Sequence, residues 1–549
     1  MSTALEKFMN KKTTTAVKTT EPIRMANLPR YNAGEIDLTD EFKTADGTWA
    51  LRPAQSLALH HAREAKGLIG LIGCGHGKTL ISFLLPTAMA SKRPLLLLPA
   101  ALIEKTKSEV RDYEPHFRVT LPKIISYERL SRPSGIDELN SYAPDLIICD
   151  ESHKIKSIDS TRTRRLAKYL FNTPSCRLCV MSGTLYNKTV ADFAHLADWV
   201  LEENSPVPRN PRDVAALDDL LTGEGDKYQY AAYTKFLRGR KPREALLDRL
   251  STTKGVVITD TETVQASLRL QTKKLDMPDE LIEAINKCFE DGVVSALGEK
   301  IDPAMLTQCD HLWEDDDAFA LRALGQLCMG LLYLWDWQGE RDDDWLNARR
   351  GWRRAVRNLL EWQEEFDSPA LIETNFDAVD GSEEFEEEYH AWQMVKHRKE
   401  PDKLQEWVSD YMIQAVKDLV EDGTIIWVGL SAVGHKLAAE LGVTYWEGGT
   451  HPTMDGKTCI MSIKSHGTGL NLQKWSKNIV LHPIADPSTW EQLIARTHRN
   501  GQLADEVTVT VFTHSIFGSS LSKAVKQSKV IQDSTSQPMR LAYADRITL

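Results

Sequence analysis

GLIGLIGCGHGKTL, residues 67–80, joins an apolar run to a glycine-rich turn and a Gly-Lys-Thr ending. This order predicts a buried strand, then a turn that can wrap around an anion, then a helix that begins near Lys78. The usual spacing of a phosphate-binding loop places a glycine where this chain has Ile72. The stretch alone therefore leaves three interpretations open: a displaced loop, a variant form of the loop, or an ordinary glycine-rich turn.

Four residues of this stretch have the chemistry that a phosphate site needs. Gly75 and Gly77 let the backbone curl so that successive N–H groups face an anion. Lys78 can neutralise two neighbouring phosphates, and the Thr79 hydroxyl can ligate Mg²⁺. The positive end of the predicted helix points at the same place.

The surroundings of this stretch predict an α/β fold. Residues 50–200 alternate short apolar runs with amphipathic helical segments, which is typical of a parallel sheet covered by helices on both faces. Ligands of such sheets bind beyond the carboxyl ends of the strands, where Lys78, Asp150 and Ser182 fall. A second series of apolar runs, at about 416–515, predicts a second α/β lobe.

The chain is 549 residues long, which allows several domains. Between the two predicted lobes lies an acidic, mostly helical stretch that contains eight of the 14 tryptophans between positions 313 and 407. We expect these tryptophans to fill a small core, although base stacking is the alternative. The predicted organisation is a flexible arm (1–30), an N-terminal lobe (31–262), a helical insertion and linker (263–415), a C-terminal lobe (416–515) and a tail (516–549). The tail is interpreted either as a brace against the lobes or as a disordered end.

The net charge of −11 is distributed unevenly. Residues 276–400 contain 31 Asp and Glu against 12 Lys and Arg, a net charge of −19, so the other 424 residues carry +8. That balance is compatible with binding a phosphate backbone. The chain has no apolar run of the ~20 residues that a membrane span needs, no secretion-like N-terminus, and scattered cysteines, which favours a cytosolic setting.

An acidic pair follows one of the predicted strands. In PDLIICDESHK, Asp150 and Glu151 come directly after an apolar run, so their carboxylates would face the loop at Lys78. Asp150 could hold a magnesium ion, and Glu151 could orient and deprotonate an attacking water molecule. The alternative is an acidic helix cap.

A third element lies far along the chain. WEQLIARTHRNGQ, residues 490–502, places Gln492, Arg496 and Arg499 at intervals of four and three, which share one face of a helix. Arginines of a second lobe that reach a nucleotide on the first would stabilise charge in phosphoryl transfer. They would act only when the lobes close, which would couple hydrolysis to movement.

The pattern Q-x-x-x-R-x-H-R-x-G-Q within this third element resembles the last motif of superfamily-2 helicases, specifically the SWI/SNF-like branch of DNA translocases. That branch commonly has G-x-G-K-T preceded by a residue other than glycine, so the loop at 72–79 resembles the variant form. The resemblance covers about 45–262 and 410–515. It implies two tandem RecA-like lobes with a helical insertion, ATP and Mg²⁺ as cofactors, and double-stranded DNA as partner. It also implies a location in the cytoplasm of a bacterial or phage-infected cell, or in a nucleus.

Further blocks resemble motifs of the same family. LRPAQ resembles the adenine-reading element, with Gln55 as base contact and Arg52 beside it. The motifs MSGTLYN and SIKSHGTGLNL resemble elements that couple the two lobes, and the second also supplies Gly469 to the nucleotide. The implied coupling residues are Ser182, Gly183, Thr184, Gly467 and Asn471. The implied DNA contacts, in LLLLPAALIEKTKSE and IISYERL, are Pro99, Lys105, Lys107, Ser126 and Tyr127.

The sequence departs from the family pattern at Leu185, His76 and His466, none of which removes a charge from the nucleotide site. Two alternative functions stay open. One is a strand-separating helicase on branched DNA or RNA; the other is a non-catalytic scaffold that binds a protein partner through the acidic insertion. In the insertion, the arginines of NARRGWRRAVRNLLEW could follow a phosphate backbone or pair with neighbouring acidic runs.

Overall fold

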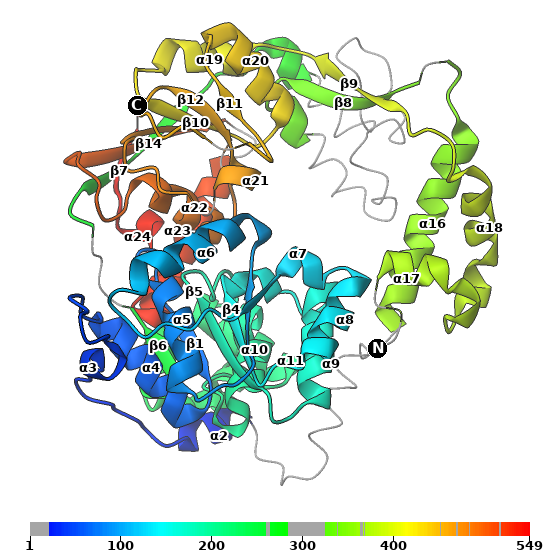
Figure 1. Cartoon of the computed structure of the whole chain (residues 1–549). Coiled ribbons are helices and arrows are strands. Elements are labelled where there is room, and N and C mark those ends of the chain that lie inside the picture. Colours follow the sequence, from blue (N-terminus) through cyan, green and yellow to red (C-terminus); the bar gives the residue numbers. More distant parts are fainter. Residues whose placement is uncertain are drawn as a thin grey trace.

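The computed structural model describes residues 21–259, 264–283, 324–337, 339–362, 366, 368–450, 452–467, 470–482, 484–514 and 518–548. These residues form an α/β structure with two parallel sheets, one of six strands and one of seven, and a separate helical module (Figure 1). We refer to the six-stranded sheet with its helices as lobe 1 and to the seven-stranded sheet with its helices as lobe 2. None of the helices in the described residues combines the length and apolar character that crossing a membrane requires.

Lobe 1 has the strand order β3-β2-β4-β5-β1-β6, with every pairing parallel. Because side chains alternate along a strand, each strand supplies both faces of the sheet. Leu68 of β1 packs with α4 and α5 on one face, whereas Ile69 packs with α10 and α13 on the other. The strands are β1 (Leu68–Leu71), β2 (Pro94–Leu98), β3 (Lys123–Ser126), β4 (Leu146–Asp150), β5 (Arg177–Ser182) and β6 (Val256–Ile258).

The helices of lobe 1 cover both faces of its sheet. The helices α5, α6, α7, α9 and α10 each come after a strand, as the alternating pattern of apolar runs predicts. They are α2 (Glu21–Asn27), α3 (Thr39–Phe42), α4 (Pro53–Ala65), α5 (Lys78–Ala88), α6 (Ile103–Tyr113), α7 (Tyr127–Leu130), α8 (Pro133–Tyr142), α9 (Thr161–Asn172), α10 (Ala191–Leu201), α11 (Pro211–Thr222), α12 (Lys227–Leu237) and α13 (Pro242–Ser251), with short 3-10 turns η1 (Ala100–Leu102), η2 (Ser152–Ile155) and η3 (Glu202–Asn204).

Lobe 2 has the parallel order β11-β12-β10-β13-β14-β7-β15. Its strands are β7 (Ser267–Lys274), β10 (Thr424–Val428), β11 (Tyr445–Trp446), β12 (Cys459–Ser462), β13 (Lys477–Val480), β14 (Glu506–Thr513) and β15 (Asp545–Thr548). Its helices are α19 (Tyr411–Leu419), α20 (Ser431–Leu441), α21 (Ile463–His466), α22 (Pro487–Thr497), α23 (Gly518–Thr535) and α24 (Arg540–Tyr543).

Two strands of lobe 2 come from outside the predicted range 416–515. Strand β7 lies in the stretch predicted as insertion and linker, and β15 lies in the predicted tail, yet both join the sheet beside β14. The pairing partners of β7 are more than 230 residues away in the sequence. Local sequence patterns carry no information about such pairings, which explains the difference. The tail is therefore packed structure, as the brace interpretation proposed.

The helical module follows a two-stranded antiparallel ribbon that leads away from lobe 2 (Figure 1). Trp335, Trp345 and Trp352 are buried in its small cores, which confirms the predicted core role for these three residues. The module touches lobe 1 where Arg164 donates to the Leu360 carbonyl at 2.7 Å. Its elements are β8 (Leu331–Asp336), α16 (Asp343–Trp362), α17 (Pro369–Thr374), η5 (Phe376–Ala378), η6 (Ser382–Phe385), α18 (Glu386–Val395) and β9 (Asp402–Trp407).

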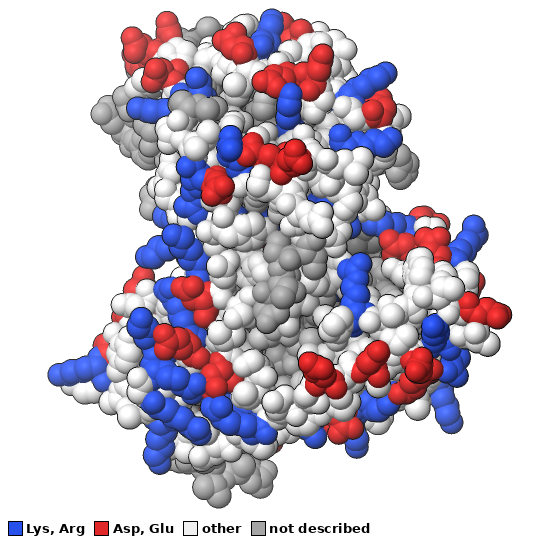
Figure 2. All heavy atoms as spheres, turned by 90° about the vertical axis from the view of Figure 1, so that its left-hand side faces the viewer, with Lys and Arg blue, Asp and Glu red and all other residues white. Residues whose placement is uncertain are grey.

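The basic helix α16 pairs at least in part with acids of its own module. Arg349 lies 3.2 Å from Glu400, and Arg354 lies 3.2 Å from Glu388. These pairs correspond to the self-neutralising interpretation of the arginine run. On the described part of the face in Figure 2, Lys and Arg are likewise interspersed with Asp and Glu over both lobes.

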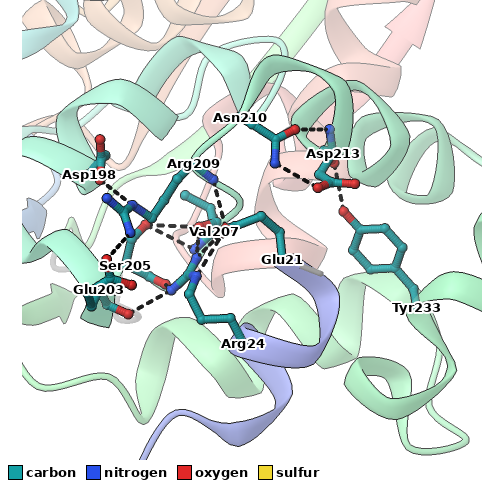
Figure 3. A network of polar contacts seen from close by, with 10 residues as sticks. All are labelled: Glu21, Arg24, Asp198, Glu203, Ser205, Val207, Arg209, Asn210, Asp213 and Tyr233. Atoms are coloured by element: carbon teal, nitrogen blue, oxygen red, sulfur yellow. Dashed lines mark hydrogen bonds and ion pairs between the residues drawn. The ribbon is translucent and has the colours of Figure 1, made fainter. Parts of the chain in front are cut away.

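Helix α2 corrects the predicted extent of the flexible N-terminal arm. Arg24 donates three hydrogen bonds of 2.7–2.9 Å to backbone carbonyls of the segment after α10, and it also pairs with Glu21 at 2.8 Å (Figure 3). Met25 is fully buried in the core of lobe 1. Residues 21–30, which belong to the predicted flexible arm, therefore include packed structure. The carbonyls belong to Glu203, Ser205 and Val207.

Candidate functional site

The loop between β1 and α5 has the backbone shape that an anion site needs. Gly75 and Gly77 have φ angles of 89° and 77°, in the left-handed region that favours glycine. A Cβ atom on Gly77 would lie 2.3 Å from Nε2 of Gln55, so any other residue there would displace the Gln55 side chain as well as strain the backbone. Gly77 caps α5, whose eleven residues direct their N-terminal amides at the loop. The helix dipole adds partial positive charge at the same point.

Lys78, the first residue of α5, is buried beneath this loop. Its Nζ donates to the Ile72 carbonyl at 3.3 Å and lies 3.9 Å from Oε1 of Glu151. Burial alone would lower the pKa of Lys78, but the nearby carboxylates, above all Glu151, raise it. The side chain is therefore a fixed cation at the loop.

Asp150 ends β4, and Glu151 is the first residue after that strand. Oδ1 of Asp150 accepts a hydrogen bond from the Glu151 N–H at 2.9 Å. Glu151 has φ 51° and ψ 46°, a left-handed conformation that costs a non-glycine residue roughly 1–2 kcal/mol. Such strain, held by the surrounding sheet, directs its carboxylate toward Lys78.

The two carboxyl groups have opposite electrostatic environments. Burial, together with the charge of Glu151, raises the pKa of Asp150 to about 6. Burial also opposes ionisation of Glu151, but Lys78 and His153 lower its pKa below the ordinary range. One carboxyl is thus held firmly as an anion while its neighbour carries uncompensated negative charge.

His153 is a member of this site that sequence reasoning missed. Its Nδ1 lies 3.2 Å from Oγ of Ser182 and 3.4 Å from Oε2 of Glu151. Its Nε2 lies 3.2 Å from Nε2 of Gln492, which belongs to lobe 2. Burial lowers the pKa of His153, which favours the neutral ring. The only sequence signal for His153 is its position two residues after the acidic pair, because its contacts Ser182 and Gln492 are 29 and 339 residues away.

The predicted coupling turn at Ser182, Gly183 and Thr184 touches both the loop and lobe 2. A Cβ atom on Gly183 would lie 3.3 Å from the amide nitrogen of Cys74, so the turn packs directly on the loop. Nε2 of Gln492 lies 3.3 Å from Oγ1 of Thr184. A movement of this turn would therefore change its contacts with both the loop and lobe 2.

Helix α22 brings Gln492 and Arg496 to the same place, whereas Arg499 lies two residues beyond the end of this helix, so the prediction of one shared helix face is wrong for Arg499. Gln492 and Arg496 are buried on α22, and the Arg496 guanidinium donates to the carbonyls of Gln492 and Leu470 at 2.8 and 3.2 Å. Arg499 donates to Oδ1 of Asn471. Burial and the neighbouring charge of Arg496 lower the pKa of Arg499. Arg496 lies near enough to influence the pKa values of Lys78 and Glu151.

Arg52 and Gln55 approach the loop from the start of α4. Nη1 of Arg52 donates to the Gly75 carbonyl at 2.6 Å. Gln55 donates from Nε2 to the Gly77 carbonyl at 3.3 Å, and its Oε1 accepts from the Arg52 N–H at 2.8 Å. Both side chains therefore brace the carbonyl side of the loop.

The second predicted coupling segment is described in part. Gly467 ends α21, and a Cβ atom there would lie 2.5 Å from the Ile463 carbonyl, so only glycine fits. Asn471 holds Arg499, as above. Gly469 lies outside the described residues.

The residues predicted to hold a metal ion are compatible with a site completed by other ligands. Thr79 is the second residue of α5, and Asp150 is a buried carboxylate with uncompensated charge. Within the described ranges, no group of three or more His, Cys, Asp and Glu could hold a metal ion. Magnesium needs only one or two protein ligands when phosphates and water supply the others, so this pair fits that ion.

The predicted DNA contacts divide into two groups. Lys107 is half-exposed and pairs with Glu104 at 3.0 Å, whereas Lys105 pairs with Glu109 at 3.7 Å. Burial and the charges of Arg499 and Arg496 lower the pKa of Lys105, although Glu109 opposes them.

Tyr127 requires a correction. Its ring is fully buried, and its hydroxyl donates to the Asp150 carbonyl at 2.9 Å, so it supports the strand end instead of facing DNA. Ser126 is buried too, and its hydroxyl caps α7 by accepting from the Arg129 N–H. Pro99 is buried at the end of β2. A sequence pattern with an aromatic residue after a strand does not indicate whether its ring faces the core or the solvent.

A scan against protein-family models and a search of curated proteins both find no match for this chain.

Proposed function

We propose that this chain is an ATP-dependent DNA translocase with two RecA-like lobes, similar to the SWI/SNF-like branch of superfamily-2 helicases. It would couple ATP hydrolysis to lobe closure and to movement along duplex DNA, in repair, recombination or replication. One structural observation carries the proposal: a buried chain of contacts runs from Lys78 through Glu151 and His153 to Gln492 of lobe 2. Charged and polar groups that lie far apart in sequence converge there. Burying such groups costs free energy, and clusters of them are typical of functional sites.

In this proposal the phosphates of ATP bind to Lys78 and to the amides of the loop at Gly75 and Gly77. Gln55 would contact the adenine, with Arg52 beside it and Gly469 on the other lobe. Thr79 and Asp150 would hold a magnesium ion, which neutralises phosphate charge when it is bound. The raised pKa of Asp150 supports this role, because a carboxylate with uncompensated charge attracts a cation.

Glu151 would orient and deprotonate the attacking water. Its lowered pKa makes it a weak base while Lys78 lies 3.9 Å away. A bound phosphate would compete for Lys78, so the pKa of Glu151 would rise toward the range that suits a general base. This exchange of partners would delay base activity until the substrate has arrived.

Arg496 and Arg499 would stabilise the charge of the transition state. Both now contact the segment at Leu470 and Asn471, so reaching a phosphate requires them to leave those partners. Gln492 would keep α22 in register with His153 while that happens. Hydrolysis would thereby change the contacts between the lobes, and this change would drive movement along DNA.

Duplex DNA is proposed as the partner on the family resemblance and on the positive balance outside the acidic segment. Exposed lysines such as Lys107 would contact phosphates, which gives grip without sequence choice. Such a protein would work in the cytoplasm of a bacterial or phage-infected cell, or in a nucleus. A protein partner could bind the acidic insertion.

ATP turnover measured with duplex DNA, single-stranded DNA and RNA tests the proposal directly. We expect duplex DNA to stimulate hydrolysis most, and Lys78→Ala to abolish it. Lys168→Ala, which removes an exposed lysine of α9, is the matched control and should behave as wild type. Turnover that survives in Lys78→Ala would contradict the phosphate-site assignment. Strongest stimulation by RNA or single strands would replace the translocase with a strand-separating helicase.

A further inference from the structure

The C-terminal segment 518–548 belongs to both lobes. Leu521 and Ala524, at the start of α23, pack in the core of lobe 2, whereas Ile531 packs in the core of lobe 1. Farther along, Met539 again belongs to the core of lobe 1 and Leu541 to that of lobe 2. Residues 545–548 then form β15, beside β7 in the sheet of lobe 2. We call residues 518–548 the C-terminal clamp, because they leave lobe 2, cross lobe 1 and return.

The clamp reaches the coupling turn of lobe 1 through Gln537. This side chain is 3% exposed, and its Nε2 donates to the Gly183 carbonyl at 2.7 Å. Gly183 packs in turn on the amide of Cys74 in the loop. One hydrogen bond therefore links the clamp to the residue that supports the loop.

Three residues later the clamp holds both ends of the arginine-bearing segment of lobe 2. Arg540, also 3% exposed, forms a buried ion pair with Glu491, whose Oε2 also accepts from the Arg540 N–H at 2.9 Å. Nη2 of Arg540 donates to the His498 carbonyl at 3.1 Å. Glu491 adjoins Gln492, and His498 lies between Arg496 and Arg499 in sequence.

We propose that Gln537 and Arg540 are positioning residues that set the register of α22 against the coupling turn. They contact Gly183 and Glu491, and they act through these two residues. Because only two residues separate them, the short turn between α23 and α24 sets the distance between a lobe 1 element and a lobe 2 element. The link holds the arginines near the loop whatever the loop binds. The expected effect of this link on ATP turnover rests on the proposed function, but the positioning of α22 does not.

Two substitutions at one position separate the hydrogen bond from the shape of the side chain. Gln537→Ala removes both, whereas Gln537→Glu keeps the shape and places a carboxylate against a carbonyl. Gln527→Ala is the control, since it changes a half-buried glutamine of the preceding helix α23. Arg540 is less suitable, because removing it would leave Glu491 buried without its partner and could prevent folding.

The first measurement is hydrogen–deuterium exchange of the full-length proteins, which needs no activity. Both Gln537 variants should exchange about fivefold faster in residues 182–187 and 487–499, as expected for losing one neutral buried hydrogen bond. The Gln527 variant should match wild type. Unchanged exchange in both segments overturns the proposal, and so does faster exchange spread evenly over both cores, which would indicate a merely structural role.

The second measurement is DNA-stimulated ATP turnover. Gln537→Ala should lower kcat about five- to tenfold while KM for ATP stays within about twofold, because only the register of α22 changes. A rise in KM with unchanged kcat overturns the positioning role. If the wild-type chain hydrolyses no ATP, the proposed function fails, while the exchange result still decides whether the clamp positions α22.

Discussion

Lobe 1 and lobe 2 bring polar groups to the same site from different kinds of element. In lobe 1, Lys78, Asp150 and Ser182 follow or end neighbouring parallel strands, so the ladder of the sheet fixes where they lie. In lobe 2, Gln492 and Arg496 lie on a helix that is held by side chains and by the clamp. The strand-end groups are preorganised, whereas the helix-borne groups depend on contacts that can be exchanged. If the proposed function holds, lobe 1 binds ATP, and the contacts of lobe 2 determine when hydrolysis occurs.

The largest expected difference between the lobes concerns Arg496. We expect Arg496→Ala to lower kcat by ~10³-fold or more while KM for ATP changes little, because the arginine acts in the transition state. Arg269→Ala, on strand β7 next to the edge strand β15 of the same lobe, is the control and should retain full turnover. Steady-state kinetics at saturating DNA measure both. A KM effect as large as the kcat effect would make Arg496 a binding group like those of lobe 1.

Glu151→Gln tests the lobe 1 side. The amide can hold water but cannot take its proton, so we expect turnover to fall by roughly 10²- to 10⁴-fold. Binding of ATP should persist, and could tighten, because Lys78 no longer shares its charge with Glu151. Fluorescent-nucleotide titration and ATP turnover together check this. Near-normal turnover would remove Glu151 from the base role.

His153 and Gln492 join the two lobes, so they are compared in a double-mutant cycle. Each of His153→Ala and Gln492→Ala should lower DNA-stimulated turnover by about tenfold, and the double variant should lose less than the two single losses multiplied together. Such non-additivity is expected because both changes break one contact, the 3.2 Å approach of the two Nε2 atoms. Additive losses would mean that the lobes communicate by another route.

The smallest effect concerns stability and pH. Folding raises the pKa of Asp150 to about 6 from an ordinary value of 3.8, so between these pH values the native state binds more protons than the unfolded state. The free energy of unfolding therefore falls as pH rises through this window, and Asp150→Asn removes that loss. We expect the variant to be about 1–2 kcal/mol more stable than wild type at pH 8 and no more stable at pH 3.5. Urea unfolding at both pH values measures the difference; equal gains at both would exclude ionisation as its cause.

Local sequence patterns predict the lobe 1 side of the site well. A strand followed by Gly-x-Gly-Lys-Thr, and a strand followed by Asp-Glu, bring Lys78 and Asp150 to one sheet edge in any parallel arrangement. The i, i+4 spacing likewise places Gln492 and Arg496 together on α22. Patterns fail where a side chain has two directions open to it. Tyr127 follows strand β3, and packing turns its ring into the core beside Asp150.

The amino-acid sequence by itself determines the α/β class and which short segments carry charge, because strand and helix periodicity and glycine conformations are local properties. The tertiary structure alone decides that β7 and β15 complete the sheet of lobe 2 and that His153 meets Gln492. It also decides that Gln537 reaches Gly183. These contacts join residues hundreds of positions apart, and their free energy depends on burial and geometry that arise only when both lobes have packed.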